Sequence, residues 1–126
     1  MPELPLQLGD LGSFSFEDGE VGLAVLGDPI AHSISPQLHN AALRELSAKD
    51  ESFKRWRYDK IEVSAGQLAD ALPRLAELGY RGINLTIPHK VEVLPLLKSV
   101  DEEALAMGAV NTLVWDECGW AGRNTD

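Results

Sequence analysis

The stretch that decides the fold is Asn84-Leu85-Thr86-Ile87-Pro88-His89-Lys90, which predicts the end of a strand followed at once by a helix. Gly82–Ile87 has the composition of a short strand, and Pro88 fits the first helical position, where its missing N–H costs nothing. We predict a helix over Pro88–Leu97, which places Lys90 in the first turn. A cation there is disfavoured by about 0.3–1 kcal/mol, so we expect a lowered Lys90 pKa and a role in proton transfer or anion binding.

Strands and helices alternate on both sides of this stretch. Val21–Leu26 is an apolar run typical of a buried strand, and Arg55–Val63 alternates as a second strand should. Helical spacing marks residues 36–46, 68–78 and 101–107, and strand patterning marks residues 110–115 and 120–125. The order predicts an α/β fold, with an open twisted, mostly parallel sheet flanked by helices and a C-terminal antiparallel hairpin. Residues 1–20 are an N-terminal arm of uncertain structure.

Composition excludes several classes of function. The 126 residues have a formal charge of −9, which argues against a nucleic-acid surface. Cys118 is the only cysteine, and the three histidines lack metal-ligand spacing, so we expect no metal site. No apolar run approaches the roughly 20 residues of a membrane span, and no secretory signal is visible at Met1. We therefore expect a cytoplasmic protein with no membrane or nucleic-acid partner.

Polar residues follow the predicted strands at the places where α/β proteins bind ligands, beyond the carboxyl ends of the strands. Ser33 and Ser35 come after the first strand, and Thr86 and Lys90 come at the end of the third. Asn84 shares a strand face with Thr86 because side chains alternate with a period of two. We expect these side chains to share one crevice.

The C-terminal hairpin is predicted to bring further polar groups to the same crevice. If residues 116–119 form the turn, Trp115 faces Trp120 and Asn111 faces Asn124, with Asp126 just beyond. Two serine hydroxyls, a threonine, a lysine, an amide and a carboxylate suit a small, polyhydroxylated, anionic ligand.

Each of these residues also has a structural explanation. Ser35 precedes Pro36 and is a good helix N-cap, whereas Ser33 has no such role in the sequence. Lys90 could be a solvated surface residue, and Asn111 could cap a turn at Gly108. Single residues therefore decide nothing, and the set has to be judged together.

Taken in order, four segments resemble the shikimate dehydrogenase family, specifically its N-terminal substrate-binding domain. The segments span most of the chain after the arm. They are Gly27-Asp28-Pro29-Ile30-Ala31-His32-Ser33-Ile34-Ser35-Pro36, Asn84-Leu85-Thr86-Ile87-Pro88-His89-Lys90, Gly108-Ala109-Val110-Asn111-Thr112 and Gly122-Arg123-Asn124-Thr125-Asp126.

The resemblance implies an oxidoreductase that reversibly reduces 3-dehydroshikimate to shikimate with NADPH, in chorismate and aromatic amino acid biosynthesis. It implies that Ser33 and Ser35 hold the substrate carboxylate and that Lys90 is the acid/base residue, paired with Asp126. The other substrate contacts that it implies are Asn84, Thr86, Asn111 and Asp126.

The family's glycine-rich nucleotide-binding turn has no counterpart in this sequence. We therefore expect residues 21–126 to be the substrate-binding domain, and NADP to bind a dinucleotide-binding domain that this chain lacks. The chain alone should bind weakly and not turn over. A quinate/shikimate dehydrogenase domain and a stand-alone, non-catalytic module for a cyclohexene carboxylate are the alternatives. Folate-linked methylene dehydrogenases have a similar layout, but their Tyr-x-x-x-Lys pattern is absent.

Overall fold

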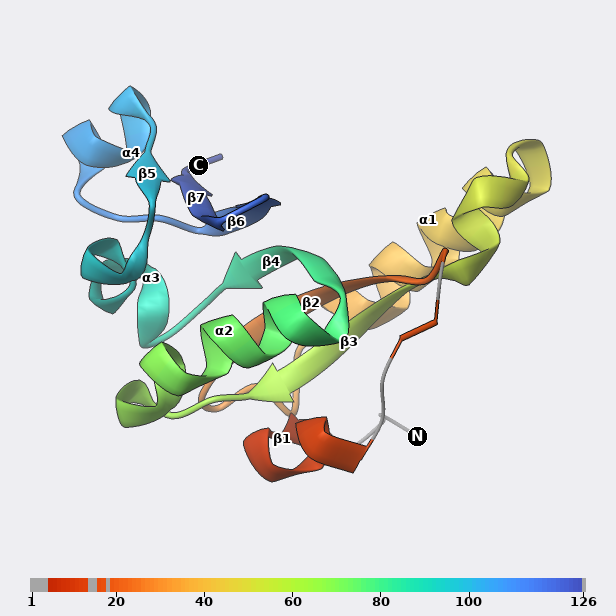
Figure 1. Cartoon of the computed structure of the whole chain (residues 1–126), viewed down its shortest axis with the longest axis horizontal. Coiled ribbons are helices and arrows are strands. Elements are labelled where there is room, and N and C mark those ends of the chain that lie inside the picture. The colour runs from red at the N-terminus through yellow and green to blue at the C-terminus, as the bar shows by residue number, and fades with distance from the viewer. Residues whose placement is uncertain (1–4, 14–15, 18, 126) are drawn as a thin grey trace.

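A single sheet organises the protein in the computed structural model, which describes residues 5–13, 16–17 and 19–125 (Figure 1). In that part of the chain the strand order is β1-β3-β2-β4-β6-β7-β5. The strands are β1 (Leu6–Gln7), β2 (Val21–Gly27), β3 (Trp56–Glu62), β4 (Tyr80–Leu85), β5 (Ser99–Val100), β6 (Thr112–Asp116) and β7 (Gly119–Arg123). The first four are parallel, whereas β6 is antiparallel to both β4 and β7. The predicted mostly parallel sheet with a C-terminal hairpin is confirmed.

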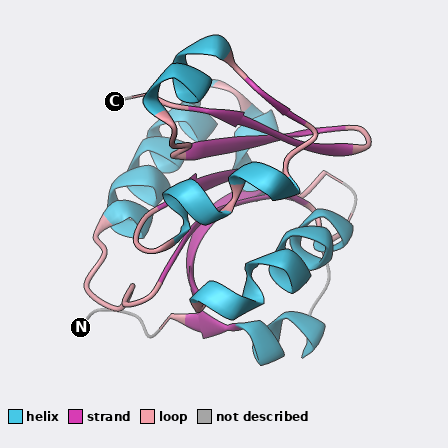
Figure 2. Ribbon diagram, turned by 90° about the vertical axis from the view of Figure 1, so that its left-hand side faces the viewer, coloured by secondary structure: helices cyan, strands magenta, loops and turns pink. Residues whose placement is uncertain are grey.

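Helices cover both faces of this sheet (Figure 2). The α-helices are α1 (Ser35–Lys49), α2 (Leu68–Leu78), α3 (His89–Glu92) and α4 (Glu102–Met107). Short 3₁₀ turns are η1 (Leu8–Ser13), η2 (Glu51–Arg55), η3 (Ala65–Gln67) and η4 (Leu94–Leu96). The two long helices, α1 and α2, lie on opposite faces, so the faces have different environments.

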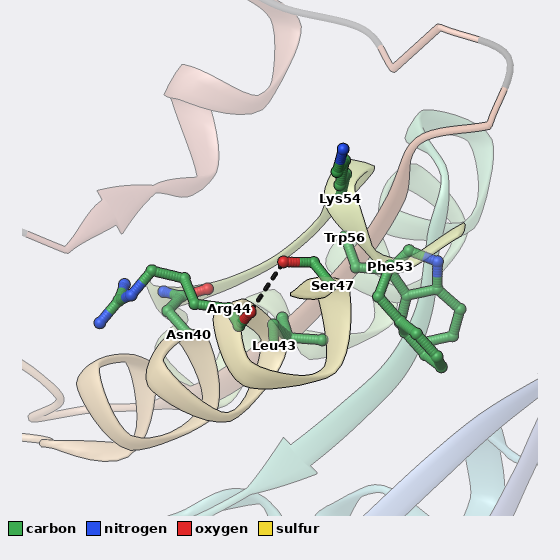
Figure 3. A pocket seen from close by; sticks show the side chains of 7 residues that line it. All are labelled: Asn40, Leu43, Arg44, Ser47, Phe53, Lys54 and Trp56. Atoms are coloured by element: carbon green, nitrogen blue, oxygen red, sulfur yellow. Dashed lines mark hydrogen bonds between the residues drawn. The ribbon is translucent and has the colours of Figure 1, made fainter. Parts of the chain in front are cut away.

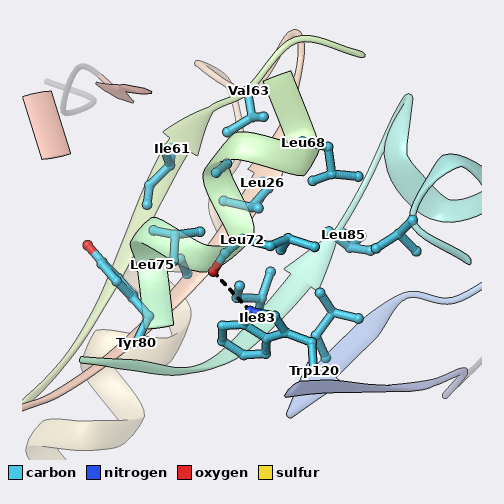
Figure 4. Packing of buried hydrophobic residues seen from close by; sticks show 14 of the residues in the cluster. Leu26, Ile61, Val63, Leu68, Leu72, Leu75, Tyr80, Ile83, Leu85 and Trp120 are labelled. Carbon is cyan, nitrogen blue, oxygen red and sulfur yellow. Dashed lines mark hydrogen bonds between the residues drawn. The ribbon is translucent and has the colours of Figure 1, made fainter. Parts of the chain in front are cut away.

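The α2 face holds the main hydrophobic core (Figure 4). Leucines at helical spacing on α2 pack against the apolar side chains that alternate along the central strands, as period-two patterning requires. The residues in this contact are Leu68, Leu72, Leu75, Leu26, Ile61, Ile83 and Leu85. The indole Nε1–H of Trp120 donates a 3.0 Å hydrogen bond to the Leu72 carbonyl, which ties the hairpin to α2.

The α1 face is much more open. Only Pro36 and Leu43 of α1 are buried, and the second buried cluster comprises just Val25, Ile30 and Tyr58. Polar side chains can therefore stand on this face of the sheet beside solvent-accessible space, and Asn84, which pairs with Val25, lies here.

The predicted helix over residues 88–97 is wrong. Helical structure is limited to the four residues of α3, followed by the 3₁₀ turn η4. Pro95 explains the break, because its ring clashes with the carbonyl four residues earlier and its nitrogen has no hydrogen to donate. Pro88 occupies the N-cap position and Lys90 the second position of α3. The argument that placed Lys90 at the positive end of a long helix therefore has no structural basis.

The strand before this turn is also shifted relative to the prediction. β4 begins at Tyr80 and ends at Leu85, two residues before the predicted end. The side chain of Ile87 is 70% exposed instead of packing in the core. Thr86 and Ile87 thus belong to the connection, although the Thr86 N–H still donates to the Leu26 carbonyl at 3.0 Å.

The C-terminal elements match the sequence closely. Trp115 pairs with Trp120, and the predicted hairpin register is confirmed. The short helix α4 is capped by the Asp101 side chain, which accepts from the Ala104 N–H at 2.9 Å. It ends at Gly108, whose φ of 72° is the left-handed conformation that glycine adopts without strain.

Part of the predicted arm belongs to the sheet. Leu6 and Gln7 pair in parallel with Ile61 and Glu62 of β3, and Leu11 is 2% exposed within the main core. The sequence offered no pairing for these residues, because a two-residue strand has no detectable periodicity.

Trp120→Phe should lower the free energy of unfolding by about 1–3 kcal/mol, because it leaves the buried Leu72 carbonyl without its indole donor. Urea unfolding measures this difference. Trp115→Phe is the matched control, since Trp115 is half-buried and stacks edge-on against Trp120. Equal losses in the two variants would contradict a specific role for the hydrogen bond.

Candidate functional site

A cavity of about 330 Å³ lies beyond the carboxyl ends of β2 and β4. Its lining residues are Val25, Pro29, Ile30, His32, Ser33, Ser35 and Thr86. The structure therefore brings together three residues that the sequence placed in one crevice, Ser33, Ser35 and Thr86. The position obeys the general rule for ligand sites in open α/β sheets.

The two serines sit in a tight loop that leads into α1. The Ser33 N–H donates to the Ile30 carbonyl at 3.0 Å, and the Ser35 N–H donates to the Ser33 hydroxyl at 3.2 Å. α1 begins at Ser35 with Ile34 at its N-cap, so the predicted N-cap role of Ser35 is wrong. Ser33 provides the local turn contact instead, because a serine hydroxyl readily accepts from the N–H two residues on.

Thr86 reaches the serine loop because glycine precedes that loop. A Cβ at Gly27 would overlap the Thr86 side-chain methyl group and press on the Ile87 carbonyl, 3.1 Å away. The Thr86 carbonyl accepts from the His89 N–H at 2.9 Å, so both sides of its backbone are fixed. Thr86 is thus held at the junction between the cavity and α3.

Backbone hydrogen bonds place Asn111 beside the end of β4 and Lys90 beside Val110, although neither Lys90 nor Asn111 lines this cavity. The Leu85 N–H donates to the Asn111 carbonyl, and the Val110 N–H donates to the Lys90 carbonyl, both at 2.8 Å. Lys90 is half-buried. Asp126, the predicted partner of Lys90, lies outside the described residues.

The side chain of Asn111 is 9% exposed and joins the open end of the hairpin. Its Oδ1 accepts from the Thr125 N–H at 3.0 Å and from the Thr112 hydroxyl at 2.9 Å. Its Nδ2 donates to the Thr125 hydroxyl at 3.0 Å. These contacts fix which atom is the oxygen, because a backbone N–H can only donate.

Asn84 is oriented in a similar way. The Tyr58 hydroxyl donates to Asn84 Oδ1 at 2.7 Å, and Asn84 Nδ2 donates to the Thr112 hydroxyl at 3.4 Å. Burial raises the pKa of Tyr58, which keeps its hydroxyl protonated as a donor. His39 stacks on the Tyr58 ring with centroids 4.1 Å apart and holds the ring in place.

His89 holds α3 against the end of β3. It is fully buried, and its Nε2 lies 2.6 Å from the Val63 carbonyl, so Nε2 must bear the hydrogen. Since His89 adjoins Lys90, this bond also limits where the lysine backbone can move.

A second pocket, of about 230 Å³, lies between α1 and η2 (Figure 3). Three of its polar side chains have local partners. The Ser47 hydroxyl donates to the Arg44 carbonyl at 2.8 Å, Asn40 pairs with the backbone of Tyr58, and Lys54 is 3.3 Å from Glu51. In Figure 3 the Arg44 side chain points away from Phe53 and Trp56, so no set of polar groups converges there.

Neither a metal cluster nor a membrane-spanning helix occurs among the described residues. No group of three or more His, Cys, Asp or Glu side chains there could hold a metal ion. No helix in that part of the chain is both long enough and apolar enough to cross a membrane.

The sequence of residues 25–113 matches the family described as the shikimate dehydrogenase substrate binding domain. The chain belongs to this family. A shikimate dehydrogenase (NADP(+)) of Synechococcus sp. strain JA-3-3Ab is 50% identical over 105 residues, covering 82% of this chain and 34% of the relative. The chain thus spans about a third of the length of the curated relatives it matches.

Solved structures agree with this assignment. The shikimate 5-dehydrogenase of Thermus thermophilus, in complex with shikimate, is 36% identical with a TM-score of 0.75, covering 83% of this chain and 38% of that one. A ligand-free 5-ketofructose reductase of Gluconobacter sp. strain CHM43 is 28% identical with a TM-score of 0.77, covering 84% and 36%.

The sequence missed three polar residues of this shikimate dehydrogenase domain, Tyr58, Thr112 and Thr125. They orient Asn84 and Asn111 through the hydrogen bonds described above. The alternation along β3 places Tyr58 on one face, but only the register between strands reveals that it reaches Asn84.

Tyr58→Phe should lower the free energy of unfolding by about 0.5–1.5 kcal/mol and shift the NMR signals of the Asn84 side-chain amide, because Oδ1 loses its donor. Urea unfolding and amide NMR spectra measure the two effects. Tyr80→Phe is the control, since Tyr80 donates to Asp59 at 2.6 Å. If the control shifts the Asn84 amide equally, Tyr58 has no specific orienting role.

Proposed function

We propose that this chain binds 3-dehydroshikimate and shikimate as the substrate-binding domain of an NADP-dependent shikimate dehydrogenase. The observation that supports it most is the cavity at the carboxyl ends of β2 and β4, where Ser33, Ser35 and Thr86 come together. The domain is assigned to residues 21–126, and residues 1–20 are an arm that adds β1 to the sheet of this domain. The reaction serves aromatic amino acid biosynthesis in the cytoplasm.

Each polar group has a role in this proposal. The hydroxyls of Ser33 and Ser35 donate to the substrate carboxylate, a charge-assisted bond stronger than a neutral one. Asn84, Thr86, Asn111 and Asp126 contact the hydroxyl groups of the ring. The hydroxyls and amides lie on different elements that the backbone holds together, which suits a ring-shaped ligand.

Lys90 is the acid/base residue. NADPH, held by a dinucleotide-binding domain of the full-length enzyme, supplies a hydride to the carbonyl carbon. The carbonyl oxygen then needs a proton, and the Lys90 ammonium is the donor. In the reverse direction neutral Lys90 removes the proton from the alcohol, with Asp126 orienting the amine. The chain alone binds substrate weakly and does not turn over.

An NMR titration of the chain with shikimate should give saturable shifts at the site residues and a Kd near 1 mM. This Kd corresponds to a binding free energy of only about 4 kcal/mol, which is reasonable for half a site. The reporters are Ser33, Ser35, Thr86, Lys90, Asn111 and Asp126. The Trp120 indole, on the other side of the sheet, is the control and should not move. Absence of shifts at millimolar shikimate would contradict the proposal, and tighter binding of quinate would favour a quinate/shikimate dehydrogenase.

Lys90→Ala should lower kcat by about 10²–10⁴ if Lys90 transfers the proton. The assay uses this chain fused to the remaining part of the Synechococcus relative, which is 50% identical over the matched region. Lys98→Ala is the control, because Lys98 is exposed and its Nζ lies 3.2 Å from a carboxylate oxygen of Asp116. Near-normal turnover of the Lys90→Ala variant would contradict a catalytic role for Lys90.

A further inference from the structure

A buried lysine lies under the serine loop. Lys60 on β3 is 5% exposed, and its Nζ donates a 2.6 Å hydrogen bond to the Ala31 carbonyl. Ala31 is two residues before Ser33. Because successive Cα atoms are about 3.8 Å apart, the ammonium group lies within roughly 13 Å of the Ser33 Cα atom.

The strand register places Lys60 on the same face as the cavity. In the parallel sheet Lys60 is paired with Val25, and Val25 is paired with Asn84. Paired residues of neighbouring strands point to the same face, so the three side chains form a row across the sheet. Val25 lines the cavity, and Lys60 stands next to it on the side of the serine loop.

Stability alone gives little reason for a lysine at this position. Burying an ammonium is costly unless it is well paired. Among the described residues Lys60 forms no salt bridge, and one carbonyl accepts from an ammonium that has three hydrogens to donate. No acidic side chain is among the residues described as lining the cavity. Among the described residues the positive charge of Lys60 therefore stands beside this cavity without an acidic partner.

The contact with Ala31 also sets the direction of the next peptide group. The Ala31–His32 peptide is trans, since the cis bonds among the described residues are those before Pro29 and Pro88. In a trans peptide the C=O and the N–H point in opposite directions. With the Ala31 carbonyl turned to Lys60, the N–H of His32 points away from Lys60, and His32 is a lining residue.

We propose that Lys60 is a positioning residue that makes this site selective for a carboxylate, by fixing the serine loop and by placing a buried positive charge behind it. This inference rests on the proposed function. The fold alone does not set the charge of the ligand, because a 5-ketofructose reductase, named for a neutral ketose, has the same fold with a TM-score of 0.77. Selectivity must then depend on local groups, and a buried positive charge adds to the preference for an anion that the serine hydroxyls provide.

The test compares shikimate with its neutral methyl ester, titrated by NMR into the whole chain. Wild type should prefer the acid, and Lys60→Met should reduce the acid-to-ester affinity ratio at least fivefold, because Met fills the space without the charge. Lys60→Arg should keep the ratio, since it keeps both charge and donor. Lys98→Met is the matched control for removing a lysine elsewhere. An unchanged ratio in Lys60→Met would overturn the inference.

A second measurement covers the case in which Lys60→Met does not fold. In wild type labelled with ¹³C-lysine, the Lys60 Cε signal, assigned with Lys60→Arg, should shift on saturation with shikimate and not with the ester. An equal response to both ligands, or no response to shikimate, would overturn the inference. If wild type binds neither ligand, the proposed function itself fails, whereas binding with an unchanged ratio removes only the role of Lys60.

Discussion

The site depends on the two backbone hydrogen bonds at the end of β4. The Leu85 N–H donates to Asn111 and the Thr86 N–H donates to Leu26, so adjacent residues join the hairpin on one side and β2 on the other. These bonds place Thr86 against the serine loop and Asn111 beside the turn that bears Lys90. Gly27 permits this approach, because a side chain there would occupy the space of Thr86. Three segments far apart in sequence thus meet at one strand end.

The sequence predicted those parts of this arrangement that depend on residues close together in the chain. The hairpin register followed from a short turn between two tryptophans, and α4 followed from Asp101 and Gly108. The two predictions that were wrong also have causes close by in the chain. The helix after Pro88 stops early because Pro95 cannot continue it, and Ser35 is not the cap because the helix begins one residue earlier, with the Leu38 N–H donating to the Ile34 carbonyl. In both cases a neighbour within a few residues decided the outcome.

Two of the residues that the sequence missed depend on contacts between distant segments. Tyr58 and Lys60 alternate correctly on β3, but their partners, Asn84 and Ala31, are 26 and 29 residues away. Parallel strands are joined by long crossovers, so no turn between them fixes the register as it does in a hairpin. A buried lysine on a strand was therefore visible in the sequence only as one polar residue among several.

The hydrogen bonds that orient the two asparagines also limit what they can offer a ligand. Tyr58 occupies Asn84 Oδ1, and Thr112 with Thr125 occupies Asn111 Oδ1. Each Nδ2 uses one hydrogen within the protein and has two, so each amide has one hydrogen left to donate. The serine and threonine hydroxyls and the Lys90 ammonium can donate as well. A site that consists mainly of donors suits a ligand rich in acceptors, and an anionic carboxylate on a hydroxylated ring satisfies more of these donors than an apolar or cationic molecule would.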